Sequence, residues 1–288
     1  MKQFRGARWA GLTALAGLAG LVLAPGAASA AQPHPWQLGF QEAATPLMES
    51  VVSFHNLLLV IISVITAFVA LLMLYVVIRY NSRTNREPTR TSHNTVLEIL
   101  WTAVPVLILL VIAIPSFRLL FQSDIIPEAD MTVKATGHQW YWSYEYPDHG
   151  AFAFDAFLVE DEDLQPGQPR LLATDNHIVV PVGAVVRLQV TASDVLHAWA
   201  VPAFGVKIDA VPGRLNETWF QVTEPGLYYG QCSELCGVRH GYMPITVEAV
   251  SPAAFDAWVA ETQARLLPAE SLPDDADTDA AVRLASNN

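Results

Sequence analysis

The hydrophobic positions fall into three long apolar runs, followed by a region of short alternating segments. The first run, Leu12–Leu23, is interrupted by glycine, follows a basic start and precedes the small-residue sequence Ala28-Ser29-Ala30. Such a pattern is typical of a secretory signal peptide, so we expect residues 1–30 to be removed. An extra membrane helix is the alternative, but the run is short for that purpose.

The next two runs are long enough to cross a membrane. Phe54–Ile78 has 25 residues, Ile99–Phe117 has 19, and neither holds a formal charge. A helix of about 20 residues spans the hydrocarbon core, so we expect a transmembrane hairpin over residues 54–120, with helices at 54–78 and 96–120. An exported arm, residues 31–53, would precede it.

The loop between these two helices, residues 79–95, sets the expected topology. It holds four arginines against a single glutamate. Positive charge concentrates in cytoplasmic loops, so we expect this loop in the cytoplasm. Both ends of the mature chain would then lie on the exported side, in agreement with a signal peptide.

From Met131 onwards the pattern changes to short segments that are rich in aromatic and β-branched residues, separated by turn signals such as Pro225-Gly226. Many short strands at this spacing predict a β-sandwich for residues 121–250. The expected strands are Met131–Ala135, Trp140–Tyr146, His177–Val182, Ala184–Thr191, Thr218–Val222, Gly226–Tyr229 and Ile245–Ala249.

The last segment, residues 251–288, predicts one helix and a tail. Ser251–Leu267 is amphipathic, with Ser251 as its cap and Pro252 at its first position. The acidic residues after Pro268 are expected to be disordered.

The charge is strongly asymmetric along the chain. From Leu120 onwards there are 24 acidic and 8 basic residues, a net formal charge of −16. This charge repels nucleic acid and anionic lipid surfaces and attracts a basic partner. We therefore expect no nucleic-acid partner. Solubility alone is the alternative explanation, especially for the tail.

The two cysteines carry the clearest chemistry. Cys232 and Cys236 are the only cysteines, His240 and Met243 follow them, and His197 lies upstream. Thiolate, imidazole and thioether form a soft ligand set that favours copper over magnesium, calcium or manganese. A mononuclear blue-copper site needs only one cysteine, so the second thiolate suggests two copper ions bridged by both sulfurs. A disulfide and a Cys2His2 zinc site are the alternatives, although zinc would not need the methionine.

At these residues the chain resembles subunit II of the haem-copper cytochrome c oxidases. The resemblance runs from about Phe54 to about Val250 and rests on three segments in the family's order: Gly137–Tyr146, Asp194–Pro202 and Gln231–Met243. It implies a two-helix transmembrane hairpin followed by an all-β cupredoxin-like Greek-key sandwich. It also implies a bacterial inner-membrane protein whose copper domain is periplasmic.

The function implied by this resemblance is electron transfer within cytochrome c oxidase. The chain would accept electrons from cytochrome c and pass them to the haem of subunit I, where oxygen reduction is coupled to proton pumping. Subunits I and III, cytochrome c and membrane lipid would be its partners. It would be the electron-transfer subunit rather than the oxygen-reducing one.

The resemblance also implies the metal ligands. Cys232 and Cys236 would be the bridging thiolates of a binuclear copper A centre, and His197 and His240 would be terminal ligands, one for each copper. Met243 would be a weak ligand of one copper, and the backbone carbonyl of Glu234 would bind the other. The Glu234 carboxylate would help to hold a magnesium or manganese ion shared with subunit I; an ordinary surface glutamate is the alternative.

The resemblance also implies residues that interact with cytochrome c. Trp140 is implied as the point at which electrons enter, whereas core packing is the expectation for the remaining aromatic residues of the run. Alternation would place Trp140 on one strand face with Trp142, Tyr144 and Tyr146, with Tyr141 opposite. The cytochrome c docking residues would be Glu145, Asp148, Asp175 and Asp194, each of which could also be a solvated surface charge.

Three further residues are implied in contacts with subunit I. Glu98 would lie at the entrance of a proton pathway, but a carboxylate near a helix N-terminus is also favoured by the helix dipole. Asp209 and Arg214 would face subunit I, or would form internal ion pairs.

Three other classes of protein are alternatives to this interpretation. A quinol-oxidase subunit II lacks the copper ligands that are present here. A nitrous-oxide reductase is a longer enzyme without the hairpin. A copper-storage or delivery protein would need an exchangeable site and would have no use for Glu98 or the aromatic run.

Overall fold

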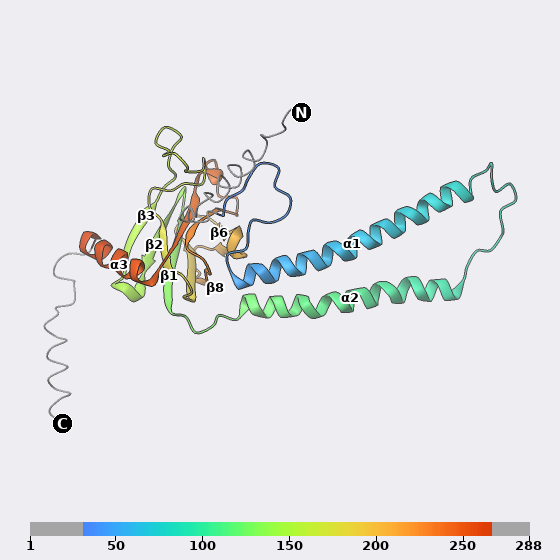
Figure 1. Ribbon diagram of the computed structural model, residues 1–288, viewed down its shortest axis with the longest axis horizontal. Coiled ribbons are helices and arrows are strands. Elements are labelled where there is room, and N and C mark those ends of the chain that lie inside the picture. The colour runs from blue at the N-terminus through green and yellow to red at the C-terminus, as the bar shows by residue number, and fades with distance from the viewer. Residues whose placement is uncertain (1–30, 267–288) are drawn as a thin grey trace, which may run out of the picture.

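The computed structural model describes residues 31–266, so the predicted signal peptide and acidic tail lie outside the described residues. Figure 1 shows a long helical hairpin that projects from a β-domain, with a third helix packed on the domain. The hairpin consists of α1 (Pro46–Arg79) and α2 (Thr95–Asp124). Both helices are long and apolar enough to cross a membrane. The predicted two-helix hairpin is therefore confirmed.

The helix α1 begins at Pro46, within residues 31–53, which were predicted to form an exported arm before the first helix. Thr45 caps this helix, because its Oγ1 accepts a hydrogen bond from Met48 N at 3.0 Å. Thr45 Oγ1 also donates to Phe204 O of the β-domain at 2.8 Å, and Leu47 and Met48 are buried. The first turn is thus held by the cap and by packing on the domain, which the apolar run alone does not reveal.

The helix α2 keeps Pro105 and Pro115 within its length, as expected for a membrane helix. Asn94 caps its start by accepting hydrogen bonds from Val96 N and Leu97 N. The helix continues to Asp124, beyond the predicted end at residue 120.

The β-domain is a sandwich. Its larger sheet has the order β3-β2-β1-β5-β8, with β1 and β5 parallel and the other pairs antiparallel. These strands are β1 (Met131–His138), β2 (Tyr141–Tyr146), β3 (Phe152–Ala156), β5 (Val186–Ala192) and β8 (Asn216–Phe220). The other strands form the order β4-β10-β9 and the pair β6-β7. Their bounds are β4 (Ile178–Pro181), β6 (His197–Val201), β7 (Val206–Ala210), β9 (Gly226–Gln231) and β10 (Pro244–Val250).

Burial alternates along the central strands β1 and β5, as expected for strands with one face on a core. The largest fully buried side chains include Trp142, Tyr144, Leu188, Trp199 and Phe204. The architecture is the predicted cupredoxin-like sandwich. The seven predicted strands are present with shifted ends, whereas β3, β6 and β7 were not predicted.

Two of the unpredicted strands, β3 and β6, have weak strand signals, whereas β7 (Val206–Ala210) does alternate between apolar and polar residues. β3 (Phe152–Ala156) contains no β-branched residue. β6 (His197–Val201) is buried at four of its five positions, so its pattern does not alternate. A buried strand of this length cannot be recognised by periodicity.

The position of Trp140 differs from the prediction. The last pair of the β1–β2 ladder is His138 with Tyr141, so Gln139 and Trp140 form the turn between the two strands. Trp140 is therefore outside the strand face that it was expected to share. The rest of that face is confirmed, because Trp142, Tyr144 and Tyr146 are buried and Tyr141 lies on the opposite face.

The third helix, α3 (Pro252–Leu266), follows the last strand. Ser251 caps it as predicted, with Oγ accepting a hydrogen bond from Ala254 N at 3.3 Å. Trp258 packs on Tyr146 and Phe152, with ring centroids 5.1 and 5.7 Å apart respectively. The helix thereby covers the aromatic side of the sandwich that is formed by β2 and β3.

Candidate metal centre

Two segments of the sandwich bring the predicted copper ligands together. His197 is the first residue of β6. Cys232 directly follows β9, and Cys236, His240 and Met243 lie in the loop that leads to β10. Because this loop returns to the sheet at Pro244, it folds its donor atoms back over His197.

The donor atoms converge around the two thiols. The two Sγ atoms are 3.9 Å apart, and Cys232 Sγ lies 3.8 Å from His197 Nδ1. Cys236 Sγ lies 3.5 Å from His240 Nδ1 and 3.6 Å from Met243 Sδ. A disulfide needs a sulfur–sulfur distance of about 2.05 Å, so the disulfide alternative does not hold and both cysteines are free.

These separations fit donors that share a metal ion. Two ligands bound at about 2.0–2.3 Å in tetrahedral geometry lie roughly 3.3–3.8 Å from each other. The donor atoms of His197, Cys232 and Cys236 all lie within 4.8 Å of one another, and all three residues are buried. The backbone oxygen of Glu234 is 3.4 Å from Cys232 Sγ. The described residues therefore form a group that can hold metal, with soft donors shielded from water.

Two glycines allow this close approach. A Cβ atom on Gly230 of β9 would lie 2.1 Å from Ala200 O of β6, and one on Gly137 of β1 would lie 2.9 Å from the His197 ring. A larger residue at Gly230 would separate β9 from β6, and hence Cys232 from His197. Sequence reasoning passed over both glycines, although each lies within or next to a quoted motif.

Asp194 holds His197 in place. The Nε2–H group of His197 donates to Asp194 Oδ1 at 2.9 Å when Nδ1 faces the thiols. The Asp194 carboxylate also accepts hydrogen bonds from Val195 N at 2.6 Å and from Gln139 N at 2.7 Å. Such outer contacts fix the orientation of a ligating histidine.

The hydrogen bonds at the site shift the pKa values of its groups. Burial acts to lower the pKa of His197, but the contacts with Cys232 and Asp194 raise it overall. Burial acts to raise the pKa of Asp194, and the hydrogen bonds from His197 and two backbone amides lower it overall.

The two thiols differ in acidity. Burial opposes ionisation of Cys232, yet the hydrogen bond with His197 and backbone hydrogen bonds lower its pKa to about 7. Burial and the neighbouring Cys232 raise the pKa of Cys236 to about 12. Cys232 is therefore the thiol that more readily supplies the thiolate needed for metal binding.

Comparison with known proteins identifies the family. Residues 131–250 match the family model "Cytochrome C oxidase subunit II, periplasmic domain", and residues 33–119 match its transmembrane domain. A probable cytochrome c oxidase subunit 2 of Rickettsia bellii is 54% identical over 243 residues, which cover 84% of this chain and 90% of the relative. The chain belongs to the cytochrome c oxidase subunit II family.

A eukaryotic relative and a solved bacterial domain are also similar to this chain in sequence. Cytochrome c oxidase subunit 2 of Phytophthora megasperma is 46% identical over 231 residues, 78% of this chain and 87% of the relative. Among solved structures, the periplasmic domain of subunit II of the Bradyrhizobium japonicum oxidase is 56% identical and covers 49% of this chain and 99% of that chain, with a TM-score of 0.47. As a subunit II, the chain is part of the oxidase enzyme.

Trp140 contacts the loop that carries the cysteines. Its Nε1–H group donates to Cys236 O at 3.2 Å, and Gln139 Nε2 donates to the same oxygen at 2.8 Å. A Cβ atom on Gly237 would lie 3.0 Å from Trp140 Cζ2, so the indole lies directly against this loop. The role of Gln139 was not predicted, although it stands beside Trp140 in the quoted motif.

The predicted docking acids of subunit II are spread along β2 and its neighbours. Glu145 lies on the outward face of β2 and pairs with Lys134 at 2.8 Å. Asp148 follows the end of β2 and accepts a hydrogen bond from Thr132 N. A strand rises about 3.3 Å per residue, so that end of β2 lies about 17 Å from the Trp140 turn.

Two other acids lie nearer to the Trp140 turn. Asp175 accepts a hydrogen bond from Phe157 N at 2.7 Å, and the Phe157 ring stacks on Tyr141. Asp155 is exposed and accepts a hydrogen bond from Ser143 at 2.6 Å. Sequence reasoning missed Asp155 because β3, which carries it, was not predicted.

The residues predicted to contact subunit I lie in three different parts of the structure. Glu98 is in the first turn of α2, one turn after the Asn94 cap. Asp209 on β7 and Arg214 are exposed, and neither takes part in a salt bridge within residues 31–266. The internal ion-pair alternative is therefore not observed. Glu234, between the cysteines, is half-buried.

Proposed function

We propose that this chain is the copper A subunit of a bacterial cytochrome c oxidase. It accepts electrons from reduced cytochrome c at a binuclear copper centre and passes them to the haem of subunit I. There, oxygen reduction is coupled to proton pumping. The observation that carries this proposal is the pair of free, buried thiols, each facing an imidazole Nδ1 atom, with a thioether 3.6 Å from Cys236 Sγ.

Each ligand has a role in this proposal. Cys232, Cys236, His197 and His240 would hold the two copper ions, Met243 would be a weak ligand of one copper, and the backbone carbonyl of Glu234 would be a ligand of the other. Copper, when bound, supplies a one-electron redox couple. The protein keeps the donors in place through Asp194 and the Gly230 contact. A fixed, dry ligand shell limits the rearrangement that accompanies electron transfer.

Cytochrome c docks where the indole of Trp140 meets the cysteine loop. Trp140 gives electrons a short path to the site, because it is hydrogen-bonded to the backbone oxygen of Cys236. The acidic residues Glu145, Asp148, Asp175 and Asp194 supply a negative field that attracts and orients a basic cytochrome. Asp155, which is exposed on β3, is added to this set.

Asp194 orients His197 and also contributes to the negative docking surface, and one substitution tests both roles. Asp194→Asn should weaken copper binding about 10- to 100-fold, as expected for loss of a contact that orients a histidine ligand. It should also reduce the salt dependence of cytochrome c association. Competitive chelator titration measures the first effect, and association rates at several salt concentrations measure the second.

Asp148→Asn is the matched control for Asp194→Asn, since its carboxylate contacts Thr132 N and no copper ligand. It should leave copper affinity unchanged. Equal copper affinity in both variants would remove Asp194 from the support of His197.

Contacts with subunit I are assigned to four residues. The half-buried Glu234 carboxylate offers a hard ligand for a magnesium or manganese ion at the junction with subunit I. Asp209 and Arg214 are exposed and free of salt bridges within the described chain, which suits residues that face another subunit. Glu98, at the far end of the hairpin from the β-domain, is assigned to the entrance of a proton pathway.

The proposed topology follows the charges. The hairpin crosses the inner membrane of a bacterium twice, with the arginine-bearing loop in the cytoplasm. The β-domain and both ends of the mature chain then lie in the periplasm. Subunits I and III are the proposed protein partners in the membrane.

Purification of the full chain from native membranes tests the assignment to an oxidase. A haem-bearing partner should co-purify and should become reduced when reduced cytochrome c is added. A chain that purifies alone and exchanges its copper readily with a chelator would instead support copper storage or delivery.

A further inference from the structure

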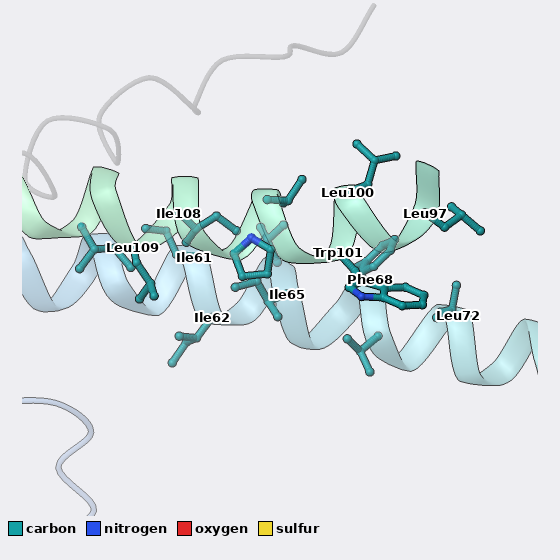
Figure 2. Close-up of a pocket in the computed structure, with 15 residues that line it drawn as sticks. Ile61, Ile62, Ile65, Phe68, Leu72, Leu97, Leu100, Trp101, Ile108 and Leu109 are labelled. Atoms are coloured by element: carbon teal, nitrogen blue, oxygen red, sulfur yellow. The ribbon is translucent and has the colours of Figure 1, made fainter. Parts of the chain in front are cut away.

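Apolar cavities lie between α1 and α2, and the one nearer to the β-domain forms an apolar groove. One cavity of about 420 Å³ lies between Val60 and Val111. It adjoins, at Ile61, Ile65 and Ile108, a second cavity of about 900 Å³ that extends towards the loop between the helices. Figure 2 shows side chains of both helices, Phe68 and Trp101 among them, around this second cavity. All the residues that line either cavity are apolar.

The groove ends in a polar cavity next to the β-domain. This cavity, of about 540 Å³, lies one turn beyond the apolar groove on both helices, with Leu57 and Pro115 at the junction. Its polar lining consists of Glu49, Ser50, Ser53, Arg118 and Gln122.

The two charged residues of this cavity mark the membrane boundary. Glu49 is the last formally charged residue before the apolar run of α1, and Arg118 is the first after that of α2. Both are exposed, and no salt bridge joins them within residues 31–266. A single cavity thus offers one positive and one negative group, separated by more than the contact distance of an ion pair.

We propose that this groove binds a phospholipid with a primary-amine headgroup, of the phosphatidylethanolamine class, in the leaflet next to the β-domain. Arg118 binds the phosphate, because a guanidinium pairs with phosphate oxygens in a bidentate manner. Ser53 and Gln122 supply neutral donors beside it. Glu49 accepts hydrogen bonds from the ammonium group.

The charges and the length of the groove both select this lipid. A purely anionic headgroup would meet the carboxylate of Glu49, and a choline headgroup has no N–H group to donate to it. At 1.5 Å per residue, Arg118 to Ile108 spans about 15 Å, half of a hydrocarbon core of about 30 Å. One acyl chain therefore extends from the polar cavity along the cavity between Val60 and Val111.

The test is lipid retention by the purified oxidase complex and by the full chain. Each is reconstituted in nanodiscs of equal parts phosphatidylethanolamine, phosphatidylglycerol and phosphatidylcholine, washed in detergent and analysed by mass spectrometry for retained lipid. Phosphatidylethanolamine should be enriched. Arg118→Gln should reduce retention of every phospholipid about tenfold, as expected for loss of a charge-assisted bond.

The variant Glu49→Gln tests the headgroup selectivity separately from the total binding of lipid. It should keep total retention and abolish the preference for phosphatidylethanolamine over phosphatidylglycerol. Arg83→Gln and Glu42→Gln, at charges outside the cavity, should change neither quantity. Equal retention of the three lipids by the unaltered chain would overturn the proposal. So would retention by the isolated chain but not by the complex, because a helix of another subunit would then occupy the groove.

Discussion

Replacing Cys232 by serine should abolish the binuclear copper signal of this chain. The two Sγ atoms lie 3.9 Å apart, and Cys232 Sγ also lies 3.8 Å from His197 Nδ1. A serine hydroxyl is a harder donor and remains protonated at neutral pH, so it cannot replace a bridging thiolate. Copper content should fall to one ion per chain or fewer. The electron paramagnetic resonance spectrum should lose the pattern that arises from two equivalent nuclei.

Ser233→Ala is the matched control for Cys232→Ser. Ser233 is adjacent in sequence, and within residues 31–266 only its backbone amide is hydrogen-bonded, to Ala198 O at 2.9 Å. Copper content and spectrum should therefore be unchanged in this variant. Circular dichroism of Cys232→Ser should show that the sandwich remains folded. Persistence of the binuclear spectrum in Cys232→Ser would refute bridging by this thiolate.

Replacing Trp140 by phenylalanine should slow electron transfer from cytochrome c while the copper spectrum stays the same. The substitution removes the Nε1–H group that donates to Cys236 O at 3.2 Å, and with it the indole edge that lies against Gly237. Tryptophans at the centre of docking surfaces are commonly hot spots, and a tenfold or larger loss of rate, about 1.4 kcal/mol or more, is expected. Stopped-flow reduction by cytochrome c measures this rate.

The ligand set is expected to survive the Trp140→Phe substitution. Gln139 Nε2 still donates to Cys236 O at 2.8 Å and keeps that carbonyl hydrogen-bonded. Trp36→Phe is the matched control, since Trp36 is 98% exposed in the arm before α1 and contacts no copper ligand. An unchanged rate in Trp140→Phe, or an equal fall in Trp36→Phe, would remove Trp140 from the path of the electrons.

The sequence predicts the proposed copper ligands, which the structure brings together, but it does not predict the residues that hold them in place. Cysteine, histidine and methionine at these spacings are uncommon, so their chemistry points directly to copper. The bond from His197 to Asp194 depends on the loop that precedes β6, a strand that the pattern does not indicate. The role of Gly230 depends on the approach of β9 to β6. Such contacts join distant segments, so local patterns do not predict them.

The ends of the helices also depend on contacts between distant segments and are therefore hard to predict from the sequence. The apolar run of α1 predicts the membrane-spanning part well, because length and hydropathy decide it. The start at Pro46 depends instead on the Thr45 cap and on burial of Leu47 and Met48 against the β-domain. Trp140 is similar, since its place in the turn is set by the register of β1 with β2 rather than by its own propensity.

The most direct test of the copper assignment is the copper-to-protein ratio of the purified full chain, measured together with its electron paramagnetic resonance spectrum. We expect two copper ions per chain and one unpaired electron whose signal is split equally by two copper nuclei. One copper ion split by a single nucleus, or a Cys232–Cys236 disulfide without copper, would contradict it.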